Sequence, residues 1–306
     1  MKIILLANHS YAIPLLHALA AQKLIQAVVM PTAIHEGNQQ LALAAQQSRT
    51  PMMRFDQTEM SSNFAAWLAM QQPDLVISYT FSYKLPEAVL KIPTYGIVNI
   101  HYSLLPSYGG PFPIFRQLKN GEKTTGITIH QMDKNWDTGP ILLQQTLAIL
   151  PGETQGLLSA RLSGMVVPMV GELLLKLSQK QLKPQVQHTA EGSYDRKPDL
   201  TDFKIDWQTQ SANAIENLVN ACNPDVGGAV TIFRGQYIKL LEVGRIVAAH
   251  PVAEAGTIVN SDATNGVIVA CLNNELIRIN VLRMAEGYYS GLKFALLGVM
   301  AGEKLS

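Results

Sequence analysis

The chain has 306 residues, of which 47% are hydrophobic and 15% are charged. This length fits about two domains of about 150 residues each, and the apolar share can fill two cores. The net charge of +1 predicts no general attraction to polyanions.

Neither a membrane segment nor a disulfide is predicted. The longest apolar stretches are interrupted by polar residues and are shorter than the about 20 residues of a membrane span. Met1 and Lys2 lead directly into an apolar run without a small-residue cleavage site, so we expect a cytoplasmic protein. Cys222 and Cys271 are far apart and lack metal-ligand spacing, which indicates two small apolar fillers.

The first half of the chain predicts alternating strands and helices. Short apolar runs typical of buried strands, separated by helix-length segments, lie at 2–7, 25–30, 74–79 and 96–102. Because these runs are almost continuously apolar, we expect an α/β fold with a doubly wound, mostly parallel sheet covered on both faces. No GxGxxG motif follows the first run, so a dinucleotide site lacks support.

An antiparallel pair and a long helix are predicted next. Residues 124–132 alternate as a half-buried strand does, and residues 140–149 can pair with them. Apolar residues then recur at helical spacing from about 154 to 178. This segment is expected to be a long amphipathic helix that Pro168 kinks.

The pattern changes after this helix. Residues 181–203 are polar and contain two prolines, which indicates a linker on the surface. Beyond Trp207, one helix at about 209–221 precedes several short strands with turn residues between them, as in a small β-barrel. The predicted organisation is a first domain at 1–180, a linker at 181–205 and a smaller β-barrel domain at 206–306.

Two strings, NIHYSLLP at 99–106 and WDTGP at 136–140, place polar side chains at strand ends. Asn99 and His101 are two residues apart, so on a strand they face the same side. An amide N–H and a protonated imidazole can both donate to one developing oxyanion, and a carboxylate such as Asp137 can hold the imidazole protonated. This set suits acyl transfer without a covalent intermediate.

Other chemistries are disfavoured by the same residues. Ser103 has no GxSxG elbow around it, so we interpret it as part of a turn. His101, His130, Asp133 and Asp137 could suggest a metal site. We expect His130 to face away on its strand, and we predict no metal.

With these residues the chain resembles the folate-dependent formyltransferases, and among them the methionyl-tRNA formyltransferases. In that family the catalytic triad is Asn, His and Asp, which corresponds here to Asn99, His101 and Asp137 with the SLLP turn between them. Shorter matches continue along the chain: KLPEAVL at 84–90, IDW at 205–207 and ACNP at 221–224. The resemblance implies a Rossmann-like catalytic domain followed by an oligonucleotide-binding-like barrel.

The resemblance also implies a reaction, the transfer of a formyl group from 10-formyltetrahydrofolate to a primary amine. Asn99 and protonated His101 would stabilise the oxyanion, and Asp137 would relay the amine proton through a water. The pteridine is expected between residues 79–85 and 132–137, where backbone groups would read its polar edge. The expected folate contacts are Phe81, Tyr83, Leu85, Met132, Asp133 and Trp136.

The acceptor is less defined than the donor. Initiator methionyl-tRNA follows from the resemblance, and a sugar-nucleotide or other small amine is the alternative. The family commonly has basic side chains where this chain has Ser107 and Gly109, and residues 31–47 contain no Lys or Arg. From Asp206 onward seven Lys and Arg stand against nine Asp and Glu, whereas residues 1–205 carry a net +3. These differences weaken tRNA as the acceptor without excluding it.

Two further classes stay open. A hydrolase could use the same triad to give the formyl group to water. A non-catalytic binding module could keep the fold, although the presence of all three chemical residues disfavours it.

Overall fold

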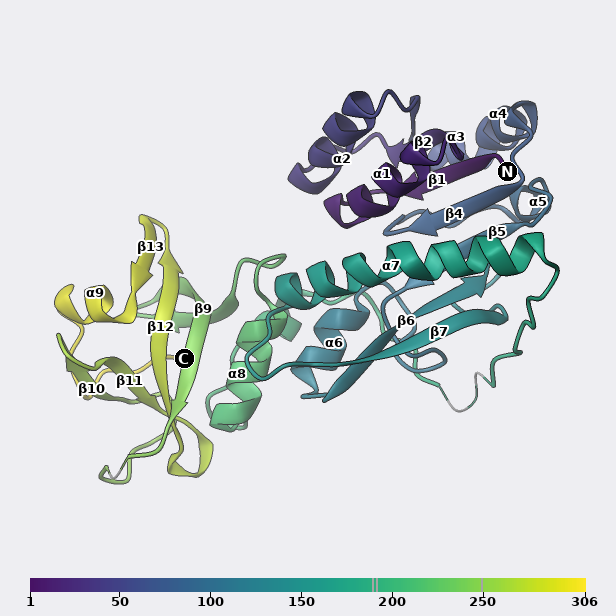
Figure 1. Ribbon diagram of the computed structural model, residues 1–306. Helices are drawn as coiled ribbons and strands as arrows, with labels where there is room; N and C mark the ends of the chain where they lie inside the picture. Colours follow the sequence, from purple (N-terminus) through teal and green to yellow (C-terminus); the bar gives the residue numbers. More distant parts are fainter. Residues whose placement is uncertain (189, 191, 249) are drawn as a thin grey trace. The chain divides into compact units, whose positions relative to one another are not determined.

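The computed structural model describes residues 1–188, 190, 192–248 and 250–306. It divides into two compact units (Figure 1). Unit 1 comprises Met1–Pro113, Thr124–Ala148 and Ser159–Arg196. Unit 2 comprises Ile114–Lys123, Ile149–Leu158 and Lys197–Ser306. The division therefore does not follow a single cut in the sequence.

Unit 1 is built on a seven-stranded sheet in the order β3-β2-β1-β4-β5-β6-β7. Its strands are β1 (Ile3–Ala7), β2 (Ile25–Pro31), β3 (Met52–Phe55), β4 (Leu75–Tyr79), β5 (Ile97–His101), β6 (Thr124–Gln131) and β7 (Ile141–Ala148). The first five pair in parallel, and β6 and β7 add an antiparallel edge. The predicted mostly parallel sheet is confirmed, and so is the pairing of the two later strands.

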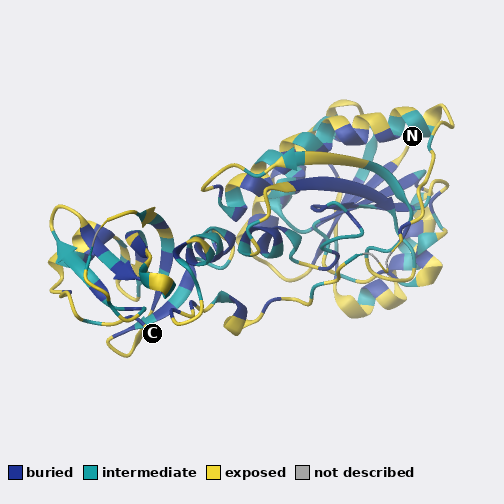
Figure 2. Ribbon diagram, turned by 90° about the horizontal axis from the view of Figure 1, so that it is seen from below, coloured by how far each residue is buried: buried dark blue, intermediate teal, exposed yellow. Residues whose placement is uncertain are grey.

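Helices cover the sheet because its strands are apolar on both faces, and every residue of β1 is fully buried. The helices of the first half are α1 (Ile13–Ala21), α2 (Glu36–Gln47), α3 (Gln57–Ser62), α4 (Phe64–Gln71), α5 (Glu87–Leu90) and α6 (Pro113–Lys119), with a 3-10 turn η1 at Ser10–Ala12. The segment 31–47, which lacks basic residues, is mostly the helix α2. In each unit the buried residues gather on the strands and the inward helix faces (Figure 2).

The long helix α7 (Gln155–Ser178) confirms the predicted amphipathic helix, and Pro168 lies inside it. Within the described residues it is also the one helix long and apolar enough to cross a membrane by length and composition, with a mean hydropathy of 1.4. Leu162, Val166 and Leu173 of its apolar stripe are fully buried. That burial is typical of the core helix of a globular unit.

Unit 2 contains α8 (Ala212–Ala221) and an antiparallel sheet in the order β10-β11-β12-β9-β8, with β13 paired to β12. The strands are β8 (Ala229–Phe233), β9 (Gln236–Ile246), β10 (Ile258–Asp262), β11 (Gly266–Ala270), β12 (Leu276–Met284) and β13 (Gly287–Ser290); η3 (Leu200–Phe203), η4 (Leu272–Asn274) and α9 (Gly291–Leu296) complete the unit. Ile258 N donates to Glu303 O at 2.8 Å, and Ile232 N donates to Ser306 O at 2.7 Å. The last residues thus bind both edge strands and close the sheet, as the β-barrel prediction requires.

The polar stretch after α7 has contacts that its composition does not indicate. Gln185 exchanges two backbone hydrogen bonds with Ile141, both of 2.8 Å. Tyr194 forms a parallel bridge with Gly109. Most of the described stretch is exposed, but Gln187 is buried. The described part of the stretch up to Arg196 therefore belongs to unit 1.

Candidate active site

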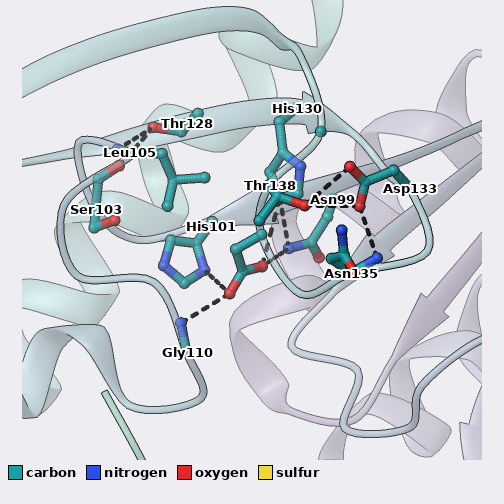
Figure 3. Close-up of polar contacts among 12 residues, drawn as sticks. Asn99, His101, Ser103, Leu105, Gly110, Thr128, His130, Asp133, Asn135 and Thr138 are labelled. Atoms are coloured by element: carbon teal, nitrogen blue, oxygen red, sulfur yellow. Dashed lines mark hydrogen bonds and ion pairs between the residues drawn. The ribbon is translucent and has the colours of Figure 1, made fainter. Parts of the chain in front are cut away.

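The site forms where β5 ends. Asn99 and His101 lie at the carboxyl end of this strand (Figure 3). Asp137 lies in the loop between β6 and β7. This is the edge at which open α/β sheets place their ligands. The structure thus brings together the three residues predicted as the triad.

Asp137 is the centre of the cluster. Four groups surround its carboxylate: the Gly110 N–H at 2.8 Å from Oδ2, the Asn99 amide at 3.3 Å from Oδ1, His130 Nε2 at 3.6 Å from Oδ1 and His101 Nδ1 at 3.8 Å from Oδ2. Burial alone would raise the pKa of Asp137, but the two imidazoles and the Gly110 N–H outweigh it and lower the pKa to about 2. The carboxylate is therefore ionised at neutral pH.

His130 was expected to face away from the site, and that prediction is wrong. It is the register partner of Asn99 across the β5–β6 ladder. Directly opposed residues of an antiparallel pair have their side chains on the same face. His130 Nε2 consequently lies 3.2 Å from Asn99 Nδ2. Correct pairing of the two strands would have predicted this position.

The SLLP turn is fixed to β6 by hydrogen bonds. Thr128 Oγ1 donates to Ser103 O at 2.6 Å and accepts from Leu105 N at 3.2 Å (Figure 3). Ser103 Oγ donates to Ser107 O at 2.7 Å. The Ser103 hydroxyl therefore serves the turn, in agreement with its structural interpretation.

A second turn, residues 108–110, was missed because its contacts come from the backbone. Tyr108 O lies 2.8 Å from His101 Nε2. Since a carbonyl only accepts, Nε2 of His101 carries the proton in this contact. Gly110 N donates to Asp137, so this one turn holds both ionisable partners. No side-chain pattern in the sequence could have indicated it.

The loop that carries Asp137 has a demanding backbone. Asp137 adopts a φ of +57°, in the left-handed region that is uncommon for residues other than glycine. A Cβ at Gly139 would lie 1.8 Å from Gln131 O, so only glycine fits after Asp137 and Thr138. The Asp-Thr-Gly string therefore encodes a loop shape as well as an acid.

The residues predicted as folate contacts lie in two settings. Phe81, Tyr83, Leu85 and Met132 gather at one hydrophobic cluster of unit 1, with the Phe81 and Tyr83 rings 5.6 Å apart. Asp133 instead shapes its own loop, since it accepts from Asn135 N and Thr138 Oγ1, both at 2.9 Å. Trp136 is 40% exposed in that loop. Their roles toward folate stay predictions.

Metal and thiol chemistry receive no support from the geometry. Among the residues that the structure describes, no group of three or more His, Cys, Asp and Glu could hold a metal ion. Cys222 and Cys271 are buried, and burial raises the pKa of each thiol to about 12. Both cysteines are therefore inert fillers.

Comparisons with known proteins agree with this geometry. The family model described as formyl transferase matches residues 1–166, and the formyl transferase C-terminal domain matches residues 199–292. Methionyl-tRNA formyltransferase of Nitrosomonas eutropha is 36% identical over 245 residues, which cover 80% of this chain and 76% of that protein.

Solved structures show the same fold at lower identity. HypX from Aquifex aeolicus in complex with tetrahydrofolic acid has a TM-score of 0.65 and 18% identity, covering 98% of this chain and 48% of that one. WlaRD, a sugar 3N-formyl transferase crystallised with dTDP and 5-N-formyl-THF, has a TM-score of 0.65 and 17% identity, covering 90% and 96%. The chain belongs to the formyl transferase family and is a formyl-transferring enzyme.

Proposed function

We propose that this enzyme moves the formyl group of 10-formyltetrahydrofolate to the amino group of methionyl-tRNA. The observation that carries the chemistry is the ionised Asp137 held between Asn99 and His101. The donor is supported by the solved neighbours HypX, in complex with tetrahydrofolic acid, and WlaRD, crystallised in the presence of 5-N-formyl-THF. The acceptor is supported by the relatives named methionyl-tRNA formyltransferase.

The reaction forms one C–N bond and breaks another. The acceptor amine attacks the formyl carbon, and the carbonyl oxygen becomes an oxyanion that Asn99 Nδ2 and His101 Nε2 stabilise. Asp137 relays the proton that leaves the amine, through a water, to the departing folate nitrogen. Collapse of the tetrahedral intermediate then releases tetrahydrofolate and the formylated amine.

Before substrate binds, both proposed donors have partners within the protein. Asn99 Nδ2 donates to Asp137, and His101 Nε2 donates to Tyr108 O. A charged oxyanion is a stronger acceptor than the neutral carbonyl of Tyr108. The hydrogen bond from His101 Nε2 is therefore stronger to the oxyanion in the transition state than to Tyr108 O in the free enzyme. Interactions that strengthen in the transition state are the ones that accelerate a reaction.

A basic cavity in unit 2 supports a polyanionic acceptor despite the net charge of that part of the chain. The cavity has a volume of about 540 Å³ and is lined in part by Lys204, Lys239 and Arg283. Tyr237, 73% exposed, adds an aromatic surface to the same lining. Clustered cations next to an aromatic ring suit the phosphates and bases of a nucleic acid.

One observation favours the alternative acceptor, a sugar-nucleotide amine. Tyr194, 58% exposed, contacts the turn at Gly109 beside Asp137. An exposed aromatic ring next to the proposed catalytic acid could form a shelf for a small planar or cyclic acceptor. This acceptor would need no basic cavity in unit 2.

The test is a transfer assay with radiolabelled formyl donor and three reactions: methionyl-tRNA, a dTDP-amino sugar, or no added amine. The proposal expects label on methionyl-tRNA, with slower loss of label from folate when no amine is present. Label on the sugar alone would move the alternative ahead, and equal loss in all three would indicate a hydrolase. A cytoplasmic location stays a prediction.

A further inference from the structure

The stretch that follows α7 contacts both loops that build the active site. Residues 185–188 and 192–195 of this stretch are here called the strap. Backbone hydrogen bonds fix the strap along the edge of β7, where Gln185 pairs with Ile141. From this edge the strap reaches the Asp137 loop first and the 108–110 turn second.

Gln187 is the contact to the Asp137 loop. Its Nε2 donates to Asp137 O at 2.9 Å and to Gly139 O at 2.6 Å. Gln187 is 9% exposed, so these two carbonyls would lose their partner in a dry environment if the amide were removed. Gln187 thereby stabilises the left-handed backbone that presents the Asp137 carboxylate.

Ser193 is the contact to the turn. Its Oγ accepts from Tyr108 N at 2.8 Å, and its backbone O accepts from Gly109 N at 2.8 Å. Asp195 N returns a bond of 2.9 Å to Gly109 O. Each residue of the turn therefore makes backbone hydrogen bonds. Tyr108 and Gly109 bind the strap, Tyr108 O also accepts from His101, and Gly110 N donates to Asp137.

Gln187 thus contacts the backbone of the Asp137 loop, whereas Ser193 contacts the turn whose Gly110 N–H binds the Asp137 carboxylate. The two strap residues therefore fix the position of Asp137 through different loops. We infer that Gln187 and Ser193 are positioning residues that hold Asp137 and His101 at their working separation. The inference rests on the proposed function, since the proposed function assigns Asp137 and His101 to formyl transfer. Neither strap residue needs to touch substrate, because a small misplacement of catalytic groups already lowers the rate.

The experiment removes each side-chain contact separately. Gln187→Met keeps the length of the side chain without its amide, and Ser193→Ala removes the hydroxyl. We expect each variant to lower kcat about 10-fold to 100-fold. Ser193→Thr keeps an Oγ and should recover most of the loss, and Ser193→Ala should leave the KM for the folate donor unchanged.

Matched controls come from the same unit. Gln26 Nε2 donates to the backbone O of Gln71 at 3.3 Å, and its Oε1 lacks a protein partner, as does that of Gln187. Ser178 Oγ donates to Leu175 O at 2.8 Å at the end of α7. Gln26→Met and Ser178→Ala should therefore keep kcat within about twofold.

A second readout does not depend on the acceptor. The Gly110 amide, bonded to Asp137, should exchange its hydrogen faster in Gln187→Met and Ser193→Ala than in wild type or the controls. The variants could show this faster exchange while the wild-type protein transfers no formyl group. That result would support the positioning contacts and contradict the proposed function.

Two results would overturn the inference. One is a kcat within twofold of wild type in Ser193→Ala, and the other is a fall in kcat while the Gly110 amide stays protected. Ser193 is exposed and alone carries the test if Gln187→Met does not fold.

Discussion

At the scale of single residues, the proposed catalytic role of the site depends on the charge on Asp137. The Asp137 side chain is 10% exposed, and its carboxylate contacts two imidazoles, an amide and a backbone N–H. Few of these contacts contribute apolar packing. Substitutions in the triad should therefore change electrostatics more than folding.

The first prediction concerns turnover. His101→Ala, Asn99→Ala and Asp137→Asn should each lower formyl transfer about 100-fold or more, because the first two remove the proposed oxyanion donors and the third removes the proposed proton relay. The circular dichroism spectrum should stay that of wild type. Wild-type turnover by a purified Asp137→Asn enzyme would show that the roles are assigned wrongly.

The second prediction concerns the ionisation of Asp137. Its pKa is lowered from the ordinary 3.8 to about 2, so the carboxylate should stay charged at pH 3. Because the folded-state pKa is the lower one, the stability linked to this charge is present above about pH 3.8 and is lost as the pH falls toward 2.

The carboxyl carbon of Asp137 can be followed by NMR and assigned with Asp137→Asn. We expect no titration of this signal between pH 7 and 3. A midpoint near pH 4 would mean that the surrounding imidazoles and the Gly110 N–H do not outweigh burial.

The sequence could predict the side chains of the site but not their backbone supports. Asn99 and His101 were proposed from strand spacing and Asp137 from the WDTGP string, and the resemblance matched all three to the catalytic triad of the family. The position of His130 required the β5–β6 register, which depends on pairing between distant residues. The turn at Tyr108 and Gly110 acts through main-chain groups, which every sequence contains.

At the scale of elements, α6 and η3 of unit 2 are joined by a charged cluster. Asp202 accepts from Arg116 at 2.9 Å and from Lys119 at 3.4 Å, and the Phe115 and Phe203 rings meet edge to face. Burial opposes the charge on Asp202, but the Arg116 hydrogen bonds hold its pKa well below the usual range. The Arg116 and Asp202 side chains are 12% and 10% exposed, so the ion pair between them is largely desolvated.

The third prediction follows from that desolvation. Asp202→Ala leaves two cations without their carboxylate and should lower the free energy of unfolding by about 3 kcal/mol in urea titrations. Asp202→Leu combined with Arg116→Met should recover part of the loss, because an apolar pair replaces the more buried ion pair while Lys119, 27% exposed, can reach water. If Asp202→Ala is as stable as wild type, water replaces the carboxylate as the partner of Arg116 and Lys119.

Elements with weak local signals were the ones that the sequence missed. β3 has four residues, and β13 has four with alternating partial exposure. α9 follows β13 directly and is capped by Ser290, whose Oγ accepts from Lys293 N. Short strands of this kind form because a neighbouring strand has unpaired backbone groups to which they can hydrogen bond. Tertiary context, and not the β-propensity of the segment, therefore determines their structure. Closure of the sheet by residues 302–306 is likewise a long-range event.

At the scale of the whole molecule, the distribution of charge matters more than its sum. Unit 2 gathers Lys204, Lys239 and Arg283 at one cavity, although the chain from Asp206 onward has a small acidic excess. Lys239 Nζ donates to Val226 O at 2.7 Å, which fixes its position at the cavity. A net count could not reveal this cluster, because the fold brings together residues far apart in the sequence.

The last prediction is a salt dependence for methionyl-tRNA binding. Three cations that each neutralise about one phosphate give a slope near −2.7 in log affinity against log salt, hence a loss of about 40-fold between about 50 and 200 mM. Lys239→Gln combined with Arg283→Gln should reduce this loss to about fourfold, since about one contact remains. Lys293→Gln, on α9 and away from the cavity lining, should keep the wild-type slope. A loss of about a thousandfold would require about six contacts and a larger basic surface than this cavity. If salt does not change the affinity of the wild type for methionyl-tRNA, a nucleic-acid acceptor is contradicted. The sugar-nucleotide amine is then favoured, because it does not require a series of phosphate contacts.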